Sequence, residues 1–393
     1  MKDILIVAHF THGRFGYIAD LLADSGEKVE IVTTNFSHGT KKHRENTNNQ
    51  QNQLKYKMTM LNENGYKKNI SLKRFYSHYI FGRNLKRYLT IREKPDVIYC
   101  AVPSLDAAYM AAQYAKKNNI KFIIDIQDLW PEAFKMVFNM PFISDLVFFP
   151  MNKKANYIYD SADEVIAVSE TYVNRALSVN NNLKNGLSVF LGTDLSNFDK
   201  FAEENKINKP SEEIWLAYIG TLGHSYDLTS VIDALSILKD KGISNIKFIV
   251  MGDGPLKSQF VDYANSKKVY TEFTGRLAYE KMVGILNSCD IAVNPIRSNS
   301  AGSIINKVGD YAAASLPVIN TQECQEYRDL ISNYSAGVNC ENGNPVVLAE
   351  QLLSLYSNSK LRRKFGENNR KLAEEKFDRN KTYAKIIPKI IIK

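Results

Sequence analysis

The amino-acid sequence predicts an α/β protein made of two doubly wound domains, each a parallel sheet with helices on both faces. The chain has 393 residues, enough for about two or three typical domains, and 44% of them are hydrophobic. Short apolar runs alternate with longer helical patterns, which is typical of parallel sheets buried on both faces. The alternation stops at a polar stretch near residues 199–213 and then starts again, which indicates a second domain of the same class.

The predicted domains are 1–197 and 198–370, and we expect 371–393 to form a helix that packs back on the first domain. The strand-like runs of the first domain are 4-ILIVAH-9, 29-VEIVTT-34, 97-VIYCAV-102, 122-FIIDI-126, 165-VIAVS-169 and 188-SVFLG-192. Those of the second are 216-LAYIGTL-222, 247-KFIVMGDG-254, 270-YTEFTG-275, 291-IAVNPI-296, 317-PVINT-321 and 337-GVNC-340. Two such domains in one chain predict a cleft between them, faced by the carboxyl ends of both sheets.

Cysteine usage and hydropathy indicate a cytoplasmic protein. The cysteines are scattered without a CxxC pair, and no signal-peptide pattern opens the chain, so we expect a reducing compartment and no structural zinc. No apolar run approaches the roughly 20 residues that span a bilayer. We therefore expect a soluble or peripheral protein.

Two segments of the first domain are candidates for contact with a membrane surface. Between residues 67 and 94, nine Lys or Arg stand against one Glu, a local charge of +8. This run suits nucleic acid, anionic lipid or an acidic substrate, or is simply a solvated helix face. No RNA-binding aromatic motif accompanies it, so nucleic acid is not an expected partner. The segment 136-MVFNMPFISDLVFFPM-151 is either core or a half-buried interfacial element.

Glycine turns follow the first strand of each predicted domain. In the second domain, Gly220 and Gly223 precede a helix that we expect to start near Asp227, an arrangement that lets a phosphate approach backbone N–H groups. In the first domain, Gly13 and Gly16 flank Arg14, whose charge faces the expected ligand crevice. An ordinary strand-to-helix turn is the alternative in both places.

The segment 125-DIQDLWPEAF-134 places carboxylates at the end of a strand. Asp128 is a candidate to accept a proton from an acceptor hydroxyl or to orient a sugar. The alternative is that Asp128 caps the following helix.

The stretch 299-NSAGSIINKVGDYAAASLPVIN-320 places Lys307 and Asp310 three residues apart at the start of a predicted helix. Positions i and i+3 share a helix face, so the ammonium and the carboxylate can contact one ligand together. The alternative is a surface ion pair, worth under about 1 kcal/mol.

Taken together, the motifs resemble those of family-4 glycosyltransferases, which have the GT-B fold and build bacterial capsules, O-antigens and lipid-linked glycans. The similarity covers nearly the whole chain. It rests on 125-DIQDLWPE-132, 162-ADEVIAVSE-170, 192-GTDLSNF-198, 218-YIGTLG-223, 251-MGDGP-255, 273-FTGRLAYEKM-282, 290-DIAVNP-295 and 306-NKVGDYAAASLPVI-319.

The resemblance implies a donor site in the second domain. Lys307 would contact the diphosphate and act in catalysis, since an ammonium stabilises the charge of the leaving group, and Asp310 would bind the ribose hydroxyls. Asp128 is the second catalytic candidate, and Gln127 stands where many relatives have an acceptor-side histidine. Further donor-binding candidates are Gly220, Thr221, Gly223, His224, Arg276, Leu277, Arg297, Gly302, Ser303 and Asn306.

The chain departs from the family at Gly302, where many relatives carry a second glutamate, and at Thr221 and Tyr226, where many carry Arg and Lys. Backbone N–H groups of Gly302 and Ser303 would then contact the donor sugar, and more of the phosphate charge would fall to Lys307, His224 and Arg297.

The resemblance implies a sugar-retaining hexosyl or N-acetylhexosaminyl transferase. It would move a monosaccharide from a nucleotide sugar, probably UDP-linked, to a lipid-diphosphate-linked or glycan acceptor in surface polysaccharide synthesis. It would work as a monomer or weak oligomer on the inner face of the cytoplasmic membrane. No metal or cofactor is expected, and the leaving phosphate can itself take the acceptor proton. The rivals are a nucleotide-sugar 2-epimerase of similar shape, which needs no acceptor, and a catalytically silent partner subunit.

Overall fold

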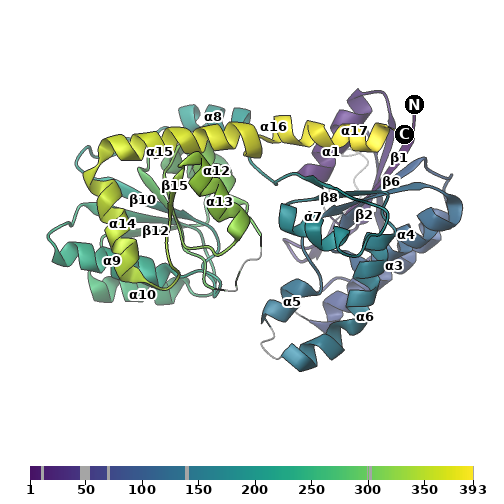
Figure 1. The fold of residues 1–393 in the computed structure, drawn as a ribbon, viewed down its shortest axis with the longest axis horizontal. Helices are drawn as coiled ribbons and strands as arrows, with labels where there is room; N and C mark the ends of the chain where they lie inside the picture. Colours follow the sequence, from purple (N-terminus) through teal and green to yellow (C-terminus); the bar gives the residue numbers. More distant parts are fainter. Residues whose placement is uncertain are drawn as a thin grey trace. The chain divides into compact units, whose positions relative to one another are not determined.

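The computed structural model describes residues 1–9, 13–44, 54–68, 71–137, 141–298, 300 and 303–392. The chain forms two compact units, Met1–Val189 with Lys381–Lys393, and Phe190–Asn380 (Figure 1). We call them unit 1 and unit 2. The chain passes from unit 1 to unit 2 between Val189 and Phe190, whereas we placed this boundary after residue 197.

Core packing explains where the chain changes unit. Phe190 contacts the ring of Phe377 at 5.4 Å between centroids and packs against the core of unit 2. Leu372 is fully buried in the same core, so the segment that returns to unit 1 starts at Lys381 and not at residue 371.

Unit 1 contains a seven-stranded parallel sheet in the order β5-β2-β1-β6-β7-β8-β9. The chain reverses its direction of travel across the sheet between β1 and β6, which is where doubly wound sheets bind ligands. The strands are β1 (Asp3–Val7), β2 (Lys28–Thr34), β5 (Lys57–Leu61), β6 (Val97–Val102), β7 (Lys121–Ile126), β8 (Glu164–Ala167) and β9 (Leu187–Ser188). A separate antiparallel pair is formed by β3 (Phe36–Ser37) and β4 (Lys42–His43).

Helices cover both faces of this sheet (Figure 1). α1 and the C-terminal α17 pack on one face, in a core that joins Ile4 and Ile6 of β1 to Tyr383, Ile386 and Ile390. α3, α4 and α6 pack together on the other face. The helices are α1 (Arg14–Asp24), α3 (Leu72–Ile91), α4 (Leu105–Asn118), α5 (Glu132–Val137), α6 (Pro141–Asp160), α7 (Glu170–Leu177), α16 (Arg379–Thr382), η2 (Tyr383–Ile386) and α17 (Ile387–Ile391).

Unit 2 contains a six-stranded parallel sheet in the order β12-β11-β10-β13-β14-β15, with its switch point between β10 and β13. The strands are β10 (Ile214–Ile219), β11 (Ile246–Met251), β12 (Thr271–Gly275), β13 (Ile291–Asn294), β14 (Val318–Asn320) and β15 (Gly337–Asn339). All six coincide with predicted runs, and the two sheets confirm the predicted fold class of two doubly wound α/β halves.

Alternate residues of β10 point into two different cores, one on each face of the sheet. Leu216 and Tyr218 pack with α9, α10 and α14, whereas Ala217 and Ile219 pack with α8, α11, α12 and α13. The helices are α8 (Leu195–Glu204), α9 (Leu228–Asp240), α10 (Lys257–Lys267), α11 (Tyr279–Asn287), α12 (Lys307–Ala313), α13 (Gln325–Tyr334), α14 (Pro345–Ser357), α15 (Ser359–Leu372) and η1 (Ala373–Phe377).

Candidate functional site

The glycine turn after β10 lies at the switch point of unit 2. The Gly220 N–H donates to Met251 O at 3.0 Å, and the Asp227 N–H donates to Pro295 O at 2.9 Å. The turn is thereby held between the end of β11 and the loop that follows β13. Gly220 has a φ of 137°, and a β-carbon on Gly252 would lie 1.8 Å from Gly220 O. Both positions therefore require glycine.

The predicted start of the following helix is confirmed. α9 begins at Leu228, and the side chain of Asp227 accepts a hydrogen bond from the Ser230 N–H at 3.3 Å, as an N-cap residue does. The Tyr226 N–H donates to Gly223 O at 3.1 Å, so the predicted second glycine stands inside a tight turn.

Lys307 is buried beside this turn. It is 9% exposed, and its Nζ lies 3.2 Å from the position that a β-carbon would occupy on Gly220. The amine stands 4.0 Å from the ring centroid of Tyr218 and 4.1 Å from that of Tyr226, and it has no hydrogen-bond partner among the described residues. Burial lowers the pKa of Lys307 well below its ordinary value. A surface ion pair with Asp310, the alternative to ligand binding, is not what the structure shows.

Asp310 is held rigidly on the same helix. Its Oδ1 accepts hydrogen bonds from Thr193 Oγ1 and from Tyr279 Oη, both at 2.8 Å. Burial raises the pKa of Asp310, and these two donors oppose the shift. The carboxylate is thereby fixed one helical turn from Lys307, with Oδ2 free of hydrogen bonds to the described residues.

The other predicted donor residues of unit 2 differ in their exposure. Thr221, His224, Arg276, Arg297 and Asn306 are exposed, whereas Leu277 and Ser303 are half-buried. Thr221 and His224 follow β10, Arg276 and Leu277 follow β12, and Asn306 directly precedes α12. Arg297 stays near the glycine turn because its N–H donates to Ser225 O at 3.0 Å. Gly302 lies outside the described residues.

Arg14 does not offer its charge to a ligand, which corrects our expectation. It is 3% exposed, its Nε lies 2.8 Å from Asp125 Oδ2, and its Nη1 donates to Val189 O at 2.6 Å. Tyr99 Oη and Gln127 Nε2 also donate to Asp125, so the carboxylate and the guanidinium form one buried network. Arg14 therefore stabilises unit 1.

The remaining residues predicted for the acceptor side lie near this network. Gly13 precedes α1 with a φ of 75°, and Gly16 is buried within α1. Asp128 accepts hydrogen bonds from the Leu129 N–H at 3.0 Å and from Trp130 Nε1 at 3.2 Å. These donors are not helix N–H groups, so the structure shows no capping by Asp128. Burial raises the pKa of Asp128, which favours its protonated form more than in water.

A small pocket of about 80 Å³ opens at the switch point of unit 1, between the ends of β1 and β6. Predicted Gln127 lines it, together with residues that sequence reasoning did not select. The lining residues are His9, Phe15, His38, Tyr66, Arg74, His78, Ala101, Val102, Pro103, Ser104, Gln127 and Trp130. His9 had a usable signal, because it follows directly on an apolar strand, whereas His78 and Glu63 had none.

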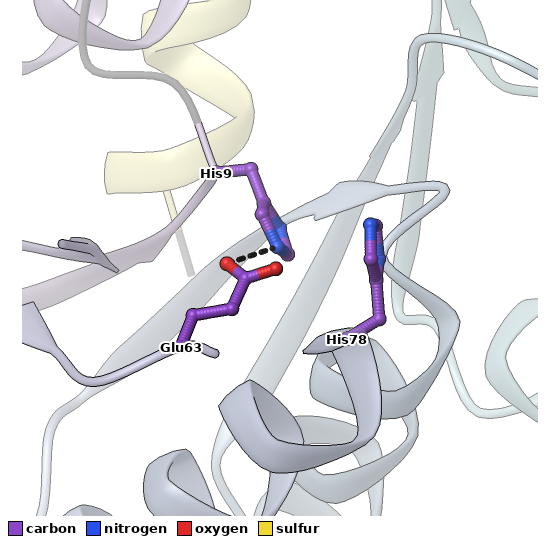
Figure 2. A group of neighbouring side chains, drawn as sticks. All are labelled: His9, Glu63 and His78. Atoms are coloured by element: carbon purple, nitrogen blue, oxygen red, sulfur yellow. Dashed lines mark ion pairs between the residues drawn. The ribbon is translucent and has the colours of Figure 1, made fainter. Parts of the chain in front are cut away.

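Three polar side chains from separate segments meet beside this pocket (Figure 2). His9 follows β1, Glu63 follows β5, and His78 lies on α3. His9 Nε2 is 3.3 Å from Glu63 Oε2, and Ser77 Oγ donates to Glu63 Oε1 at 2.7 Å. The rings of His9 and His78 stack with centroids 4.6 Å apart and planes inclined by 22°.

This cluster is the one place among the described residues where three or more His, Cys, Asp or Glu side chains bring ligand atoms within 4.8 Å of one another. Its donors are of the type that binds Zn²⁺. However, an imidazole nitrogen binds a metal in the plane of its ring, and the two rings stand nearly parallel. Their nitrogens therefore do not converge on one ion as they stand.

A second, larger hollow of about 450 Å³ lies on unit 1 between α3, α4 and α6, and its lining is mainly apolar. Two of the residues that line it are highly exposed, Leu72 by 86% and Val147 by 62%, and Leu146, which precedes Val147 in the sequence, is 79% exposed. Its lining residues are Leu72, Phe75, Tyr76, His78, Tyr79, Leu105, Asp106, Trp130, Val147, Phe148, Met151 and Lys154. None of the described helices is long and apolar enough to cross a bilayer.

The basic run is mostly an exposed face of α3. Arg83, Lys86 and Arg87 point to solvent. Arg92 differs from them, because its Nε lies 3.0 Å from Glu30 Oε2 and its Nη2 lies 2.7 Å from Asp3 Oδ1. Arg92 therefore belongs to a partly buried ion-pair network and not to the free basic surface.

Comparison with known proteins gives the class of the second unit and the fold of the whole chain. Residues 199–372 match the family described as Glycosyl transferases group 1. Over 242 residues, the chain is 24% identical to an uncharacterized glycosyltransferase, MJ1069, of Methanocaldococcus jannaschii. That alignment covers 60% of this chain and 60% of the relative, so the chain spans less than two thirds of that protein.

Solved structures match almost the full length. Sucrose-phosphate synthase from Thermosynechococcus elongatus aligns over 98% of this chain and 97% of its own, with 16% identity and a TM-score of 0.71. HepE from Anabaena, solved in complex with UDP, aligns over 99% of both chains, with 13% identity and a TM-score of 0.66. These likenesses establish the GT-B fold, with two Rossmann-like halves.

Proposed function

We propose that the protein is a glycosyltransferase that moves a monosaccharide from a UDP sugar to a lipid-linked acceptor, with retention of anomeric configuration, in surface polysaccharide synthesis. The observation that carries the proposal is the buried, unpartnered amine of Lys307 beside the glycine turn of unit 2. A buried polar group without a partner is rare and often marks the place of a ligand.

The arrangement suits a nucleoside diphosphate. The diphosphate would lie against the Gly220 turn, where it restores the charge on Lys307 and receives its hydrogen bonds, and Asp310 would accept hydrogen bonds from the ribose hydroxyls. In the reaction, negative charge grows on the leaving diphosphate, and a buried ammonium stabilises it more strongly than an exposed one. HepE binds UDP in a chain of the same fold, which supports the choice of nucleotide.

The apolar hollow of unit 1 supports a lipid-linked acceptor. Its exposed Leu72 and Val147, with exposed Leu146 beside Val147 in the sequence, would give apolar contact, and the basic face of α3 would attract anionic headgroups. Together they would hold unit 1 on the inner leaflet, where a polyprenyl-diphosphate sugar presents its hydroxyls.

The test is a donor screen that follows release of nucleoside diphosphate, with and without a lipid-diphosphate sugar acceptor. The proposal predicts that UDP is released from a UDP sugar only when the acceptor is present. It also predicts that the transferred sugar has the same anomeric configuration, α or β, in the product as in the donor, which NMR can measure. Release without an acceptor, accompanied by a free epimerised sugar, would instead identify a 2-epimerase. A parallel assay with a chelator is expected to show full activity, because Lys307 supplies the positive charge that a metal would otherwise provide.

A further inference from the structure

We propose that His9 and Glu63 form a catalytic pair in the unit 1 pocket, in which His9 binds the attacking hydroxyl of the acceptor and takes its proton. This inference rests on the proposed function and identifies a base for it. It starts from the position of His9, which follows β1 at the switch point and lines the pocket. A ligand in a doubly wound sheet binds at that edge.

The contact with Glu63 determines which nitrogen of His9 is available. Nε2 lies 3.3 Å from Glu63 Oε2, so the neutral ring that this contact favours carries its proton on Nε2. Nδ1 then holds the lone pair. Both ring nitrogens are buried and neither makes an aligned hydrogen bond among the described residues, so it is the closeness of Nε2 to Glu63 that distinguishes them. A base oriented through its other nitrogen by a carboxylate is the arrangement that general-base catalysis requires.

The surroundings of Glu63 keep its carboxylate ionised and hold it in place. It is fully buried, Ser77 Oγ donates to its Oε1 at 2.7 Å, and its own N–H donates to Asn35 Oδ1 at 2.9 Å. Burial alone would raise the pKa of Glu63, but the close contact with His9, the charge of His9 and hydrogen bonds from Thr34 and Ser77 lower it below its ordinary value. The carboxylate therefore stabilises the imidazolium that forms when His9 takes a proton.

His78 supports the ring of His9 without competing for the proton. The two rings stack, and Phe81 packs edge-on against His9 with ring centroids 4.5 Å apart. Burial, the charge of His9 and that of Arg74 keep the pKa of His78 well below its ordinary value, so His78 stays neutral. The titratable and charged groups around His9 are Glu63, His78, His38, Lys41, Arg44 and Arg74.

The proton and electron balance is complete without a further reagent. Because the configuration is retained, the acceptor oxygen forms the new bond on the same face of the sugar from which the phosphate leaves, while the bond from the anomeric carbon to the phosphate oxygen breaks. The hydroxyl proton moves to His9 Nδ1, and the leaving nucleoside diphosphate keeps the electron pair. His9 returns its proton to solvent after product release. The competing route sends the proton to the leaving phosphate and needs no base.

The first test reads the tautomer directly and needs no substrate. In protein labelled with ¹⁵N-histidine, the signals of His9 are assigned by their loss in His9→Ala among the 6 histidines of the chain. In the neutral ring we expect a proton on Nε2 and an unprotonated Nδ1. A ring protonated on Nδ1 would overturn the proposal, whatever the activity assays give.

The second test uses the full enzyme with the UDP sugar and lipid-diphosphate acceptor from the donor screen. We expect His9→Ala to lower kcat by on the order of 10²–10⁴, with UDP affinity unchanged and partial recovery in added imidazole. Glu63→Gln is expected to lower kcat in the same direction without such recovery. His43→Ala, a change of an exposed histidine on β4, is the matched control and is expected to keep full activity.

The outcomes separate this inference from the proposed function. If the wild-type enzyme is active and His9→Ala keeps its kcat, His9 is not the base. The acceptor proton would then go to the leaving phosphate, and the proposed transferase function would be unaffected. If the wild-type protein releases no nucleoside diphosphate from any donor, the proposed transferase function is contradicted. The tautomer measurement then still tests whether Glu63 orients His9 as proposed. Micromolar or tighter Zn²⁺ binding that His9→Ala abolishes would assign the cluster to a metal and overturn the base.

Discussion

The Nζ atom of Lys307 lies 3.2 Å from the place where any side chain on Gly220 would begin. The amine and the turn thus occupy adjoining space, although the two residues are far apart in the sequence. A β-carbon at position 220 would displace the amine, and loss of the amine would leave the turn without its charge. The two residues therefore act as one unit of the donor site.

Replacing Lys307 by Met is expected to lower kcat/KM by on the order of 10²-fold or more, because a charged group on the leaving diphosphate contributes about 3 kcal/mol in the transition state. Acceptor-dependent UDP release measures this. Lys281→Met, a change of an exposed lysine on α11, is the control. Normal turnover in Lys307→Met would contradict the donor-site assignment.

The same substitution is expected to stabilise the free protein. The pKa of Lys307 is lower in the folded protein than in the unfolded chain, so burial of the amine costs stability wherever the unfolded lysine is charged. That cost is present at neutral pH and fades as the pH rises toward about 10. We expect a higher Tm for Lys307→Met at pH 7 and a smaller difference from wild type at pH 9.5. An equal or lower Tm at pH 7 would argue against a desolvated amine.

Binding of UDP is expected to take up a proton at Lys307. Free enzyme holds the amine with a lowered pKa, and the diphosphate restores the charged form. Calorimetry in buffers of different ionisation enthalpy should therefore show uptake of up to about one proton, and UDP affinity should fall as the pH rises through the lowered pKa. Lys307→Met should show no such uptake; uptake of the same size in that variant would place the titrating group elsewhere.

Asp310→Asn is expected to weaken recognition of the nucleoside part of UDP without affecting recognition of the diphosphate. Loss of the charged acceptor for the ribose hydroxyls should weaken UDP binding by about 1.5–3 kcal/mol, roughly 10- to 150-fold, and leave binding of inorganic diphosphate unchanged. Calorimetry with both ligands measures this, with Asp262→Asn on the exposed face of α10 as the control. Equal weakening of both ligands would show that Asp310 acts by orienting Lys307 instead.

Arg14→Met is expected to destabilise unit 1 without affecting the donor site. The substitution leaves the Asp125 carboxylate buried without its cation, which costs about 3–5 kcal/mol. Urea unfolding should show an early transition for unit 1, while UDP affinity measured below that transition stays at the wild-type value. Arg83→Met, on the exposed face of α3, should unfold as wild type does.

Vesicles containing anionic lipid are expected to sediment the protein. Changing Arg83, Lys86 and Arg87 to Glu should release it at low salt and leave UDP affinity intact, since each basic residue near the surface contributes about 1 kcal/mol. Arg92 is left out of this set because it pairs with Glu30 and Asp3. Wild-type protein that stays in the supernatant would make a soluble acceptor the better interpretation.

The control for that experiment is an equal change of charge on unit 2. Lys360, Arg363 and Lys364 are exposed on α15, and their replacement by Glu is expected to leave sedimentation unchanged. Replacing Leu146 and Val147 by Ser should remove the part of the binding that persists in high salt, because apolar contact is not screened by ions.

Patterns local in the sequence predicted most of the fold and part of the site. Apolar runs predicted all the strands of unit 2, and Asp227 marked the start of α9. β5 was missed, since Lys57–Leu61 is a short edge strand that alternates polar and apolar residues after an Asn/Gln-rich stretch. Run 188–192 was predicted too long, because β9 ends at Ser188.

Long-range contacts could not be predicted from these patterns. Arg14 reads as a charge beside a glycine turn, and only its pairing with Asp125 shows it to be structural. Similarly, the i, i+3 spacing of Lys307 and Asp310 predicts a shared face, but not that the amine is buried against Tyr218. No sequence pattern near Glu63 predicts its role, because that role depends on contact with His9, which follows a different strand.

The return of the C-terminal segment to unit 1 has a consequence for protein synthesis. Tyr383, Ile386 and Ile390 complete the core under α1, so unit 1 can finish its packing only after the chain up to Ile390 has left the ribosome. Unit 2 is complete by then, because its residues end at Asn380. Until those last residues emerge, the α1 face of the nascent N-terminal unit stays open and apolar, and it is the surface that a ribosome-associated chaperone would have to shield.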